Sequence, residues 1–428
     1  MATPLVLVAD DLSGAAELAA LAAARGLSAE VHRHPQGAWQ ADVIALDADA
    51  RGLDAAEAAQ RWQRLAAEVM RRRPAALYLK VDSVLRGHPH IQVASFLQAS
   101  GRKRAVLVPA NPSHGRRIVG GQYTIHGQPL EESALARDPQ YPRTTSDLAQ
   151  LLAGTGARIL RRPVRSAADL ASLGILVPDA ASAEDLQALA ALVDETTLAA
   201  GAADFFAALL EARGFAPANA AAAPATPVLR PPALLVCGSP TGWRLRARQC
   251  EAAGLAVCVW HETPAEDRGG NFSPLVPAEA AAVAARIPTS GNAVLALGDP
   301  QVPLPQAEAM LQRFCQVSAQ VVALVQPSSL LVEGGATAGL LVAALGWHSF
   351  RVLPQTSSSV GLLVPCDPAR PPFPEQTGDA LPAPQLWIKP GSYAWPDEVW
   401  KGLVGAGGAR ASVGPCSQDR PASRQAPA

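Results

Sequence analysis

Adjacent carboxylates, Asp10 and Asp11, follow an apolar run at 5–9 that is short and β-branched enough to form a buried strand. An alanine-rich stretch typical of a helix comes next. The pair is therefore expected at the carboxyl edge of a parallel sheet, where open α/β folds bind ligands. Such a pair can hold a divalent metal or accept hydrogen bonds from sugar hydroxyls. Alternatively, one aspartate caps the helix and the other is solvated. The residues alone leave both interpretations open.

A second expected strand ends in two carboxylates and a cation. The segment 47–51 contains Asp47, Asp49 and Arg51. On its own this pattern fits a polar loop with a local ion pair as well as it fits a ligand site. Its position adds weight, because parallel strands in a doubly wound sheet deliver their carboxyl ends to one crevice.

A third strand end offers the most varied chemistry. The strand expected at 76–80 leads into a run that contains Lys80, Asp82, Ser83 and Arg86. These residue types suit an anionic small molecule that is rich in hydroxyl groups. Arg86 can grip a carboxylate with its planar guanidinium, and Asp82 can accept a proton from a substrate hydroxyl. A structural turn held by salt bridges is the alternative interpretation.

Glycine turns distinguish the second half of the chain. They occur where expected strands pass into helices, at 238–239 and 333–337, and a similar turn follows a short strand at 389–391. Backbone amides at a helix N-terminus form a ready site for anions, although paired glycines also serve tight packing. Neither of the first two turns matches G-x-x-x-x-G-K-[ST] or G-x-G-x-x-G, which argues against a P-loop and a dinucleotide fingerprint.

Composition bounds the class of protein. The chain has 428 residues, of which 49% are hydrophobic, and its formal net charge is −1. This length predicts two or three domains, and the absence of a basic stripe argues against nucleic acid as a partner. Six scattered cysteines without a C-x-x-C pair fit a reducing cytoplasm. The start of the chain has no features of a secretion signal, and no apolar run is long enough to span a membrane. We therefore expect a cytoplasmic protein that does not bind membranes.

The expected fold class is α/β, with two doubly wound, mostly parallel-sheet domains. A Pro/Ala-rich linker at 216–232 separates a first domain at 1–215 from a second at 233–402, and 403–428 has the composition of a disordered tail. A β-hairpin insertion with Gly127 in its turn is expected at 120–142. The abundant alanine is interpreted as compositional bias with good helix propensity.

Alternating apolar and polar stretches give the expected elements. Strands are expected at 5–9, 43–46, 76–80, 105–108, 174–177, 233–237, 255–260, 293–297, 321–325, 330–332 and 386–388, and helices at 55–70, 182–192, 242–253 and 338–345.

Taken in order, these motifs resemble the four-carbon acid sugar kinase family, which phosphorylates erythronate, threonate and their oxidised relatives with ATP. The opening A-D-D-L-S-G-A at 9–15 resembles the family's A-D-D-L-T-G-A. The run at 80–87 resembles K-x-D-S-T-L-R-G, and 47–51 resembles an acidic-to-Arg strand end. A P-A-x-P-x-x-G-R segment is matched at 109–116 and A-R-D-P at 136–139. The resemblance extends from Leu5 to about Trp400.

The resemblance implies that the first domain binds the sugar acid and the second binds the nucleotide. On the substrate side it points to Asp10, Asp11, Lys80, Asp82, Ser83 and Arg86, and the matching strand end adds Asp49 and Arg51. On the nucleotide side it points to Ser239, Gly334, Gly335, Ala336, Thr337 and Gly391. Asp82, or one of the Asp10-Asp11 pair, would orient or deprotonate the hydroxyl that is phosphorylated.

The same resemblance implies ATP as phosphoryl donor and Mg²⁺ bridging its phosphates, with no residue assigned as a metal ligand. The expected partners are thus a small sugar acid and ATP, and the hairpin insertion favours a homodimer by offering surface outside the sheet. The family's G-G-D-T has Ala336 at the acidic position, and its acidic G-E-x-x-P-G is replaced at 355–361. We therefore expect a divergent branch.

Two alternatives remain at this stage. The first is a catalytically silent sugar-acid-binding or regulatory relative with an altered nucleotide site, which Ala336 favours. The second is a nucleotide-dependent oxidoreductase, against which the missing G-x-G-x-x-G argues.

Overall fold

A computed structural model describes residues 3–138, 140–216, 228–238, 243, 246–247, 249–250, 252–261, 275–288, 291–298, 304–354, 360–366, 384–391 and 394–405. The strands of the first half are β1 (Leu5–Ala9), β2 (Ala29–His32), β3 (Val43–Asp47), β4 (Ala76–Lys80), β5 (Arg104–Val108), β6 (Arg116–Val119), β7 (Gln122–Ile125), β8 (Gln128–Pro129), β9 (Arg158–Ile159), β10 (Gly174–Val177) and β11 (Thr197–Gly201). Those of the second half are β12 (Ala233–Cys237), β13 (Ala256–Trp260), β14 (Ala293–Leu297), β15 (Ser329–Glu333), β16 (Ser349–Val352), β17 (Gly361–Pro365) and β18 (Gln385–Lys389).

The helices cover both halves of the chain. They are α1 (Leu12–Ala23), α2 (Ala55–Arg71), α3 (Pro89–Ser100), α4 (Leu148–Leu151), α5 (Ala183–Ala190), α6 (Ala203–Ala212), α8 (Leu275–Ala284), α9 (Leu304–Val325), α10 (Gly335–Ala344) and α11 (Asp397–Gly405). Short 3₁₀ turns are η1 (Pro112–His114), η2 (Leu130–Glu132), η3 (Ala134–Arg137) and η4 (Ala167–Leu170).

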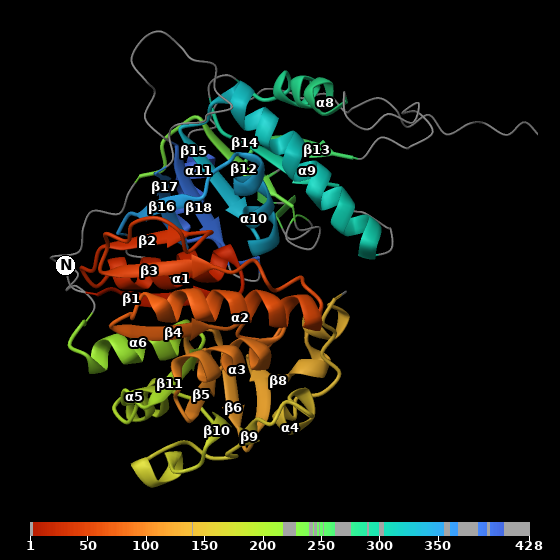
Figure 1. The fold of residues 1–428 in the computed structure, drawn as a ribbon. Coiled ribbons are helices and arrows are strands. Elements are labelled where there is room, and N and C mark those ends of the chain that lie inside the picture. The colour runs from red at the N-terminus through yellow and green to blue at the C-terminus, as the bar shows by residue number, and fades with distance from the viewer. Residues whose placement is uncertain are drawn as a thin grey trace, which may run out of the picture.

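One sheet runs through both halves of the molecule. Among the described residues it contains 15 strands, in the order β13-β14-β12-β15-β18-β17-β16-β2-β3-β1-β4-β11-β5-β10-β9. Only the pairs β2-β16, β16-β17 and β17-β18 within this sheet are antiparallel. Figure 1 shows the N-terminal half below, the C-terminal half above, and β2 and β16 at their junction. The predicted α/β class is confirmed, and the continuity of the sheet across the two halves is an additional finding.

The junction consists of a short antiparallel pairing. Phe350 of β16 lies opposite Val31 of β2, and both side chains are fully buried. Because β2 and β16 are short and partly polar, their sequences carry little strand signal, and neither is predicted from the hydrophobic pattern.

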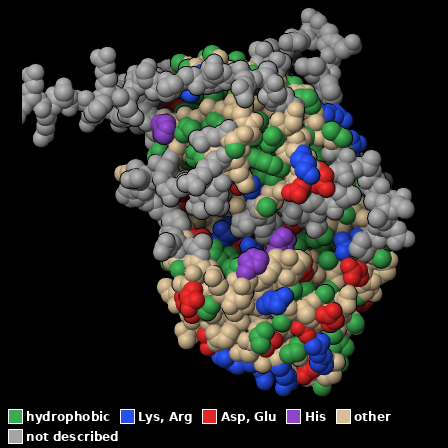
Figure 2. Space-filling model, turned by 180° about the vertical axis from the view of Figure 1, so that it is seen from behind, with side chains coloured by type: hydrophobic (Ala, Val, Ile, Leu, Met, Phe, Trp, Pro, Cys, Tyr) green, Lys and Arg blue, Asp and Glu red, His purple; other side chains and the backbone are tan. Residues whose placement is uncertain are grey.

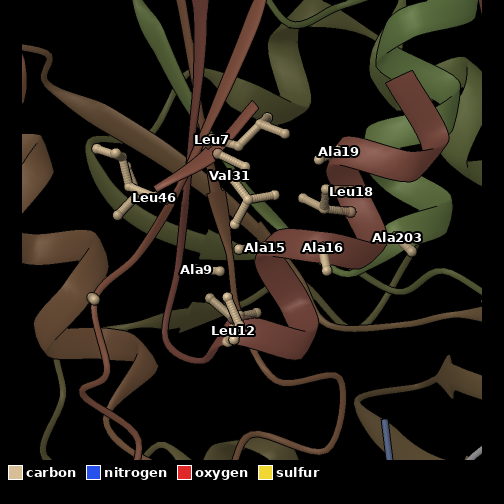
Figure 3. Packing of buried hydrophobic residues seen from close by; sticks show 14 of the residues in the cluster. Leu7, Ala9, Leu12, Ala15, Ala16, Leu18, Ala19, Val31, Leu46 and Ala203 are labelled. Carbon is tan, nitrogen blue, oxygen red and sulfur yellow. The ribbon is translucent and has the colours of Figure 1, made fainter. Parts of the chain in front are cut away.

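Helix α1 is buried over its whole length, as expected of a helix that packs on all sides. Figure 3 shows its small side chains between strand residues such as Leu7 and Val31 and Ala203 of α6. On another side α1 meets the C-terminal half, where a Cβ on Gly361 would lie 2.5 Å from Cβ of Ala16. The alanines of α1, attributed above to compositional bias, are therefore a packing requirement.

The predicted hairpin insertion is present, but it begins before residue 120 and has a third strand. Strands β6, β7 and β8 form a separate three-stranded antiparallel sheet, which begins at Arg116 and has Gly127, with φ of 82°, in its second turn. Tyr123 of β7 is fully buried. The insertion therefore packs against the first half rather than projecting from it.

One predicted strand is wrong. Residues 321–325 form the end of helix α9. The buried side chains Phe314, Val317, Val321 and Val322 recur at helical spacing. The strand was predicted from a short β-branched run, whereas the periodicity over the longer segment is that of a helix.

The described surface carries charges of both signs. On the face in Figure 2, acidic and basic side chains of the described residues are interspersed over the lower half rather than gathered into a basic patch. No helix in the described part of the chain is long and apolar enough to cross a lipid bilayer.

Candidate active site

Three neighbouring strands bring the predicted polar residues together. Strand β1 lies between β3 and β4, and Ala9 is in register with both Asp47 and Lys80. The segments that follow these strands therefore leave the sheet side by side, as the sequence pattern predicts for parallel strands.

Arg51 is the centre of this cluster. Its Nε and Nη2 donate to the two carboxylate oxygens of Asp10 at 2.7 and 2.8 Å, and its Nη1 donates to Oδ2 of Asp11 at 2.5 Å. Nη2 also lies 3.7 Å from Oδ1 of Asp82. Burial opposes the charge on Arg51, but the three carboxylates outweigh it and raise the pKa of the guanidinium well above its ordinary value.

Asp10 and Asp11 have different environments. Asp11 caps α1, because its Oδ1 accepts from the N–H of Gly14 at 2.8 Å and its Oδ2 accepts from the hydroxyl of Ser13 at 2.9 Å. Asp11 is thus a helix cap and a partner of Arg51 at once. Burial raises the pKa of Asp10 despite the opposing charge of Arg51, so Asp10 holds a proton more readily than an ordinary aspartate.

Asp82 organises the turn after β4. Its Oδ2 accepts from the backbone N–H groups of Val84 and Arg86 at 3.2 and 3.0 Å. The Arg86 guanidinium donates through Nε and Nη2 to the same carboxylate at 3.1 and 2.8 Å. Burial alone would raise the pKa of Asp82, but Arg86 and Arg51 hold it well below the ordinary value. Asp82 is therefore held as an anion.

Lys80 and Ser83 are each fixed by a residue that sequence reasoning missed. Lys80 Nζ lies 3.4 Å from Oε2 of Glu17 in α1, and both side chains are buried. The Ser83 hydroxyl accepts a short hydrogen bond from Arg116 of β6, and the Ser83 carbonyl accepts from the Tyr123 hydroxyl at 2.5 Å. The P-A-x-P-x-x-G-R segment contains Arg116, but no local pattern marked Glu17, because both contacts depend on tertiary packing.

Asp47 and Asp49 share Arg33. Its Nε lies 3.5 Å from Oδ2 of Asp47, and its Nη2 lies 3.3 Å from Oδ2 of Asp49. Burial and the neighbouring Asp49 raise the pKa of Asp47 to about 7, against the charge of Arg33. The Asp49 side chain is 66% exposed, so it stands at the rim of the cluster.

On the nucleotide side, two predicted glycine turns lie side by side. Gly334, with φ of 101°, precedes α10, and its N–H donates to the carbonyl of Lys389 at 2.9 Å. A Cβ on Gly391 would lie 3.7 Å from Cα of Gly334. Ala336 is exposed in the first turn of α10 and Thr337 is buried. The remaining predicted residue, Ser239, lies outside the described residues.

A buried ionic cluster supports these turns. Glu333, the residue before Gly334, contacts Lys389 through Oε1 at 3.1 Å. Its Oε2 accepts from Arg246 Nε at 3.2 Å and from Trp395 Nε1 at 3.0 Å. Glu333 and Lys389 thus tie the ends of β15 and β18 together just before the chain turns. Sequence reasoning missed Glu333 because it concentrated on the glycines.

The two sides meet directly. A Cβ on Gly335 would lie 1.9 Å from Oδ2 of Asp11 and 2.8 Å from the hydroxyl oxygen of Ser13. The start of α10 therefore abuts the start of α1, and the carboxylate cluster of the first half faces the glycine turns of the second.

The N-terminal half of the chain matches a known domain family. Residues 5–209 match the model of the sugar-binding N-terminal domain family. Among curated proteins, the chain is 36% identical over 208 residues to a D-threonate kinase of Cupriavidus necator, covering 44% of this chain and 48% of that relative. It is 27% identical to a D-threonate kinase of Bordetella bronchiseptica, covering 83% and 88%. The chain thus spans about half the length of the first relative and most of the second.

A crystal structure of a Salmonella typhimurium LT2 protein has the same fold, with a TM-score of 0.68 at 18% identity over 91% of this chain and 96% of that one. That likeness shows the α/β fold alone, and the family match covers only the N-terminal half of the chain. The family match and the named relatives confirm that the motifs resemble those of the four-carbon acid sugar kinase family.

The environment of Asp47 predicts a pH effect on stability. Its folded pKa of about 7 lies above the ordinary value of 3.8, so the native state binds the proton more tightly than the unfolded chain. The resulting stabilisation is complete below about pH 4 and is lost as pH rises through about 7. We expect the Asp47→Asn variant to lose less stability than the wild type between pH 4.5 and 8, with a difference of at most about 4 kcal/mol.

Thermal unfolding across this pH range measures the effect. The control is Asp42→Asn. Asp42 lies at the amino end of β3, away from the carboxyl ends that carry the cluster, and its hydrogen bonds with Ser28 lower its pKa. This control should follow the wild type above pH 4.5. Parallel curves for Asp47→Asn and the wild type would contradict the assignment.

Proposed function

We propose that this chain is an ATP-dependent kinase that phosphorylates a hydroxyl of a four-carbon sugar acid, such as a tetronate or its oxidised derivative. The observation that carries the proposal is the contact between the start of α10 and Asp11. It sets a buried cluster of carboxylates and guanidinium groups, suited to a hydroxyl-rich anion, against glycine turns suited to phosphates. The names of the relatives support the same reaction and substrate class.

The glycine turns fit the phosphates of ATP. Helix α10 has ten residues and begins at Gly335, so its first N–H groups can receive an anion. A side chain at Gly335 would collide with Asp11, and one at Gly391 would enter the space beside Gly334. When bound, ATP supplies the phosphoryl group that is transferred.

Mg²⁺ would arrive with the phosphates of ATP, and no residue of the described chain is assigned to it. Among the described residues, no group of three or more His, Cys, Asp or Glu side chains could hold a metal ion. Mg²⁺ commonly binds one or two carboxylates and completes its shell with waters and substrate phosphates. Asp10 and Asp11 are already bound by Arg51, so phosphates and waters would supply the ligands of the ion, which would neutralise charge on the phosphates.

The protein groups have distinct roles in this proposal. Phosphoryl transfer requires mainly positioning and charge stabilisation. Asp10 accepts the proton of the substrate hydroxyl, because its pKa is raised and the carboxylate is buried. Asp82 remains an anion and holds the turn that presents Ser83. Lys80, neutralised in part by Glu17, adds positive charge at the same edge.

Coupled ADP release tests the reaction directly. The purified chain is supplied with Mg²⁺ and ATP and with a panel of four- to six-carbon sugar acids. We expect turnover that is strongest for four-carbon acids and absent without an acceptor. Failure to turn over every acid, with the protein shown to be folded, would rule out the kinase. Binding of a sugar acid without binding of ATP would instead identify a silent relative.

Asp10→Asn tests the proton acceptor. Asparagine keeps the size of the side chain but cannot accept the proton, so we expect kcat to fall about 10²- to 10⁴-fold while KM for ATP changes little. Steady-state kinetics with the best acid from the panel measure both constants. The control Asp42→Asn should retain the wild-type kcat. A kcat for Asp10→Asn within threefold of the wild type would exclude Asp10 as the acceptor.

A further inference from the structure

The cations that the sequence assigns to the sugar side already have carboxylate partners in the protein. Arg51 is engaged by the aspartate pair, Arg86 by Asp82, and Lys80 by Glu17. A substrate carboxylate could bind these groups only in competition with the contacts that build the site. The anionic end of a sugar acid therefore needs a further cation.

Arg143 meets this need. Its Nε and Nη2 atoms are both buried, and neither has a hydrogen-bond partner among the described residues. These two nitrogens form one edge of the guanidinium, and their N–H groups point the same way. Buried donors without partners are rare in folded proteins. An edge of this kind matches the two oxygens of one carboxylate.

The segment that carries Arg143, which includes Asp138 and Tyr141, is bonded to the site. The Tyr141 hydroxyl donates to the carbonyl of Arg51 at 2.6 Å. Asp138 accepts from the N–H of Tyr141 at 2.8 Å, and its Oδ2 lies 3.9 Å from Nη1 of Arg86. The backbone N–H of Arg143 itself donates to the carbonyl of Leu135 at 3.0 Å. The segment is thus held at both the Arg51 loop and the Arg86 turn.

The charges around Arg143 agree with this placement. Burial lowers the pKa of Arg143, while Asp82 and Asp138 act in the opposite direction and Arg86 adds to the lowering. The guanidinium is therefore within electrostatic reach of the turn at 80–87. Arginine stays charged in such surroundings, so its two open donors remain available to an anion.

We propose that Arg143 binds the carboxylate of the sugar acid side-on through Nε and Nη2, and that it selects acids over neutral polyols of the same length. This proposal rests on the kinase function proposed above. Arg86, which the sequence suggested as the group that grips the substrate carboxylate, instead stabilises the turn at 80–87 through its contacts with Asp82. The substrate is then held at its acid end by Arg143 and at its reacting hydroxyl by the aspartate pair.

Arg143→Met and Arg143→Lys test the proposal against a matched control. Arg102 also has a buried nitrogen without a partner among the described residues, and its Nε donates to the carbonyl of Glu195 at 2.8 Å. It lies before β5, at the opposite end of the strand from the site. Arg102→Met therefore removes a similar side chain far from the substrate.

Kinetics with a tetronate and with the matching neutral tetritol provide the measurement, together with tetronate binding by calorimetry without ATP. For Arg143→Met we expect KM and Kd for the tetronate to rise about 100-fold, with KM for ATP within about twofold of the wild type. The preference for acid over tetritol should fall by a similar factor. Arg143→Lys should be intermediate, since it keeps the charge and loses the fork. Arg102→Met should match the wild type.

The outcomes separate this inference from the kinase proposal. If the wild type phosphorylates the tetronate and Arg143→Met and Arg143→Lys keep its KM, Kd and preference, Arg143 is not the carboxylate site although the kinase stands. If the wild type neither binds nor phosphorylates any sugar acid, the kinase proposal fails and this inference fails with it. Circular dichroism of each variant establishes that it is folded before either result is interpreted.

Discussion

The contact of Arg51 with Asp10 and Asp11 is the interaction on which the rest of the site depends. Two adjacent carboxylates at a buried sheet edge repel each other, and removal of the partner of a buried charge costs about 3–5 kcal/mol. Arg51 binds both carboxylates and lies near Asp82 as well. It thereby links the ends of β1, β3 and β4 into one unit, and Tyr141 extends that unit to the segment of Arg143.

The second constraint is the close approach of α1 to the C-terminal half. Glycine at 335 and 361 and alanine at 16 leave no room for larger side chains at these contacts. The same approach pairs β2 with β16 and makes the sheet continuous. The carboxylate cluster and the glycine turns are consequently held by one framework. Enclosure of a phosphoryl-transfer site in this way excludes water and orients both substrates.

The sequence predicted the parts of this site that lie at strand ends, because a buried apolar strand followed by charged residues is a local pattern. It therefore placed Asp10, Asp82 and Gly334 correctly at the ends of their strands. It missed contacts that join distant segments, such as Arg116 with Ser83 and Arg143 near Asp82. It also missed β16, which is short and partly polar, and it took the end of α9 for a strand, because a short apolar run does not distinguish the two periods.

The central claim is that the start of α10 and the aspartate pair form one phosphoryl-transfer site, and Gly335→Ala tests it most directly. The added Cβ would lie 1.9 Å from Asp11 Oδ2, whereas a Cβ on Gly339 in the same helix would meet only Asp49 Oδ1, at 3.9 Å. The measurement is kcat/KM for phosphorylation of the best sugar acid by each folded variant. We expect a loss of about 100-fold or more in Gly335→Ala and little change in Gly339→Ala. Equal activity of the two variants would contradict the account.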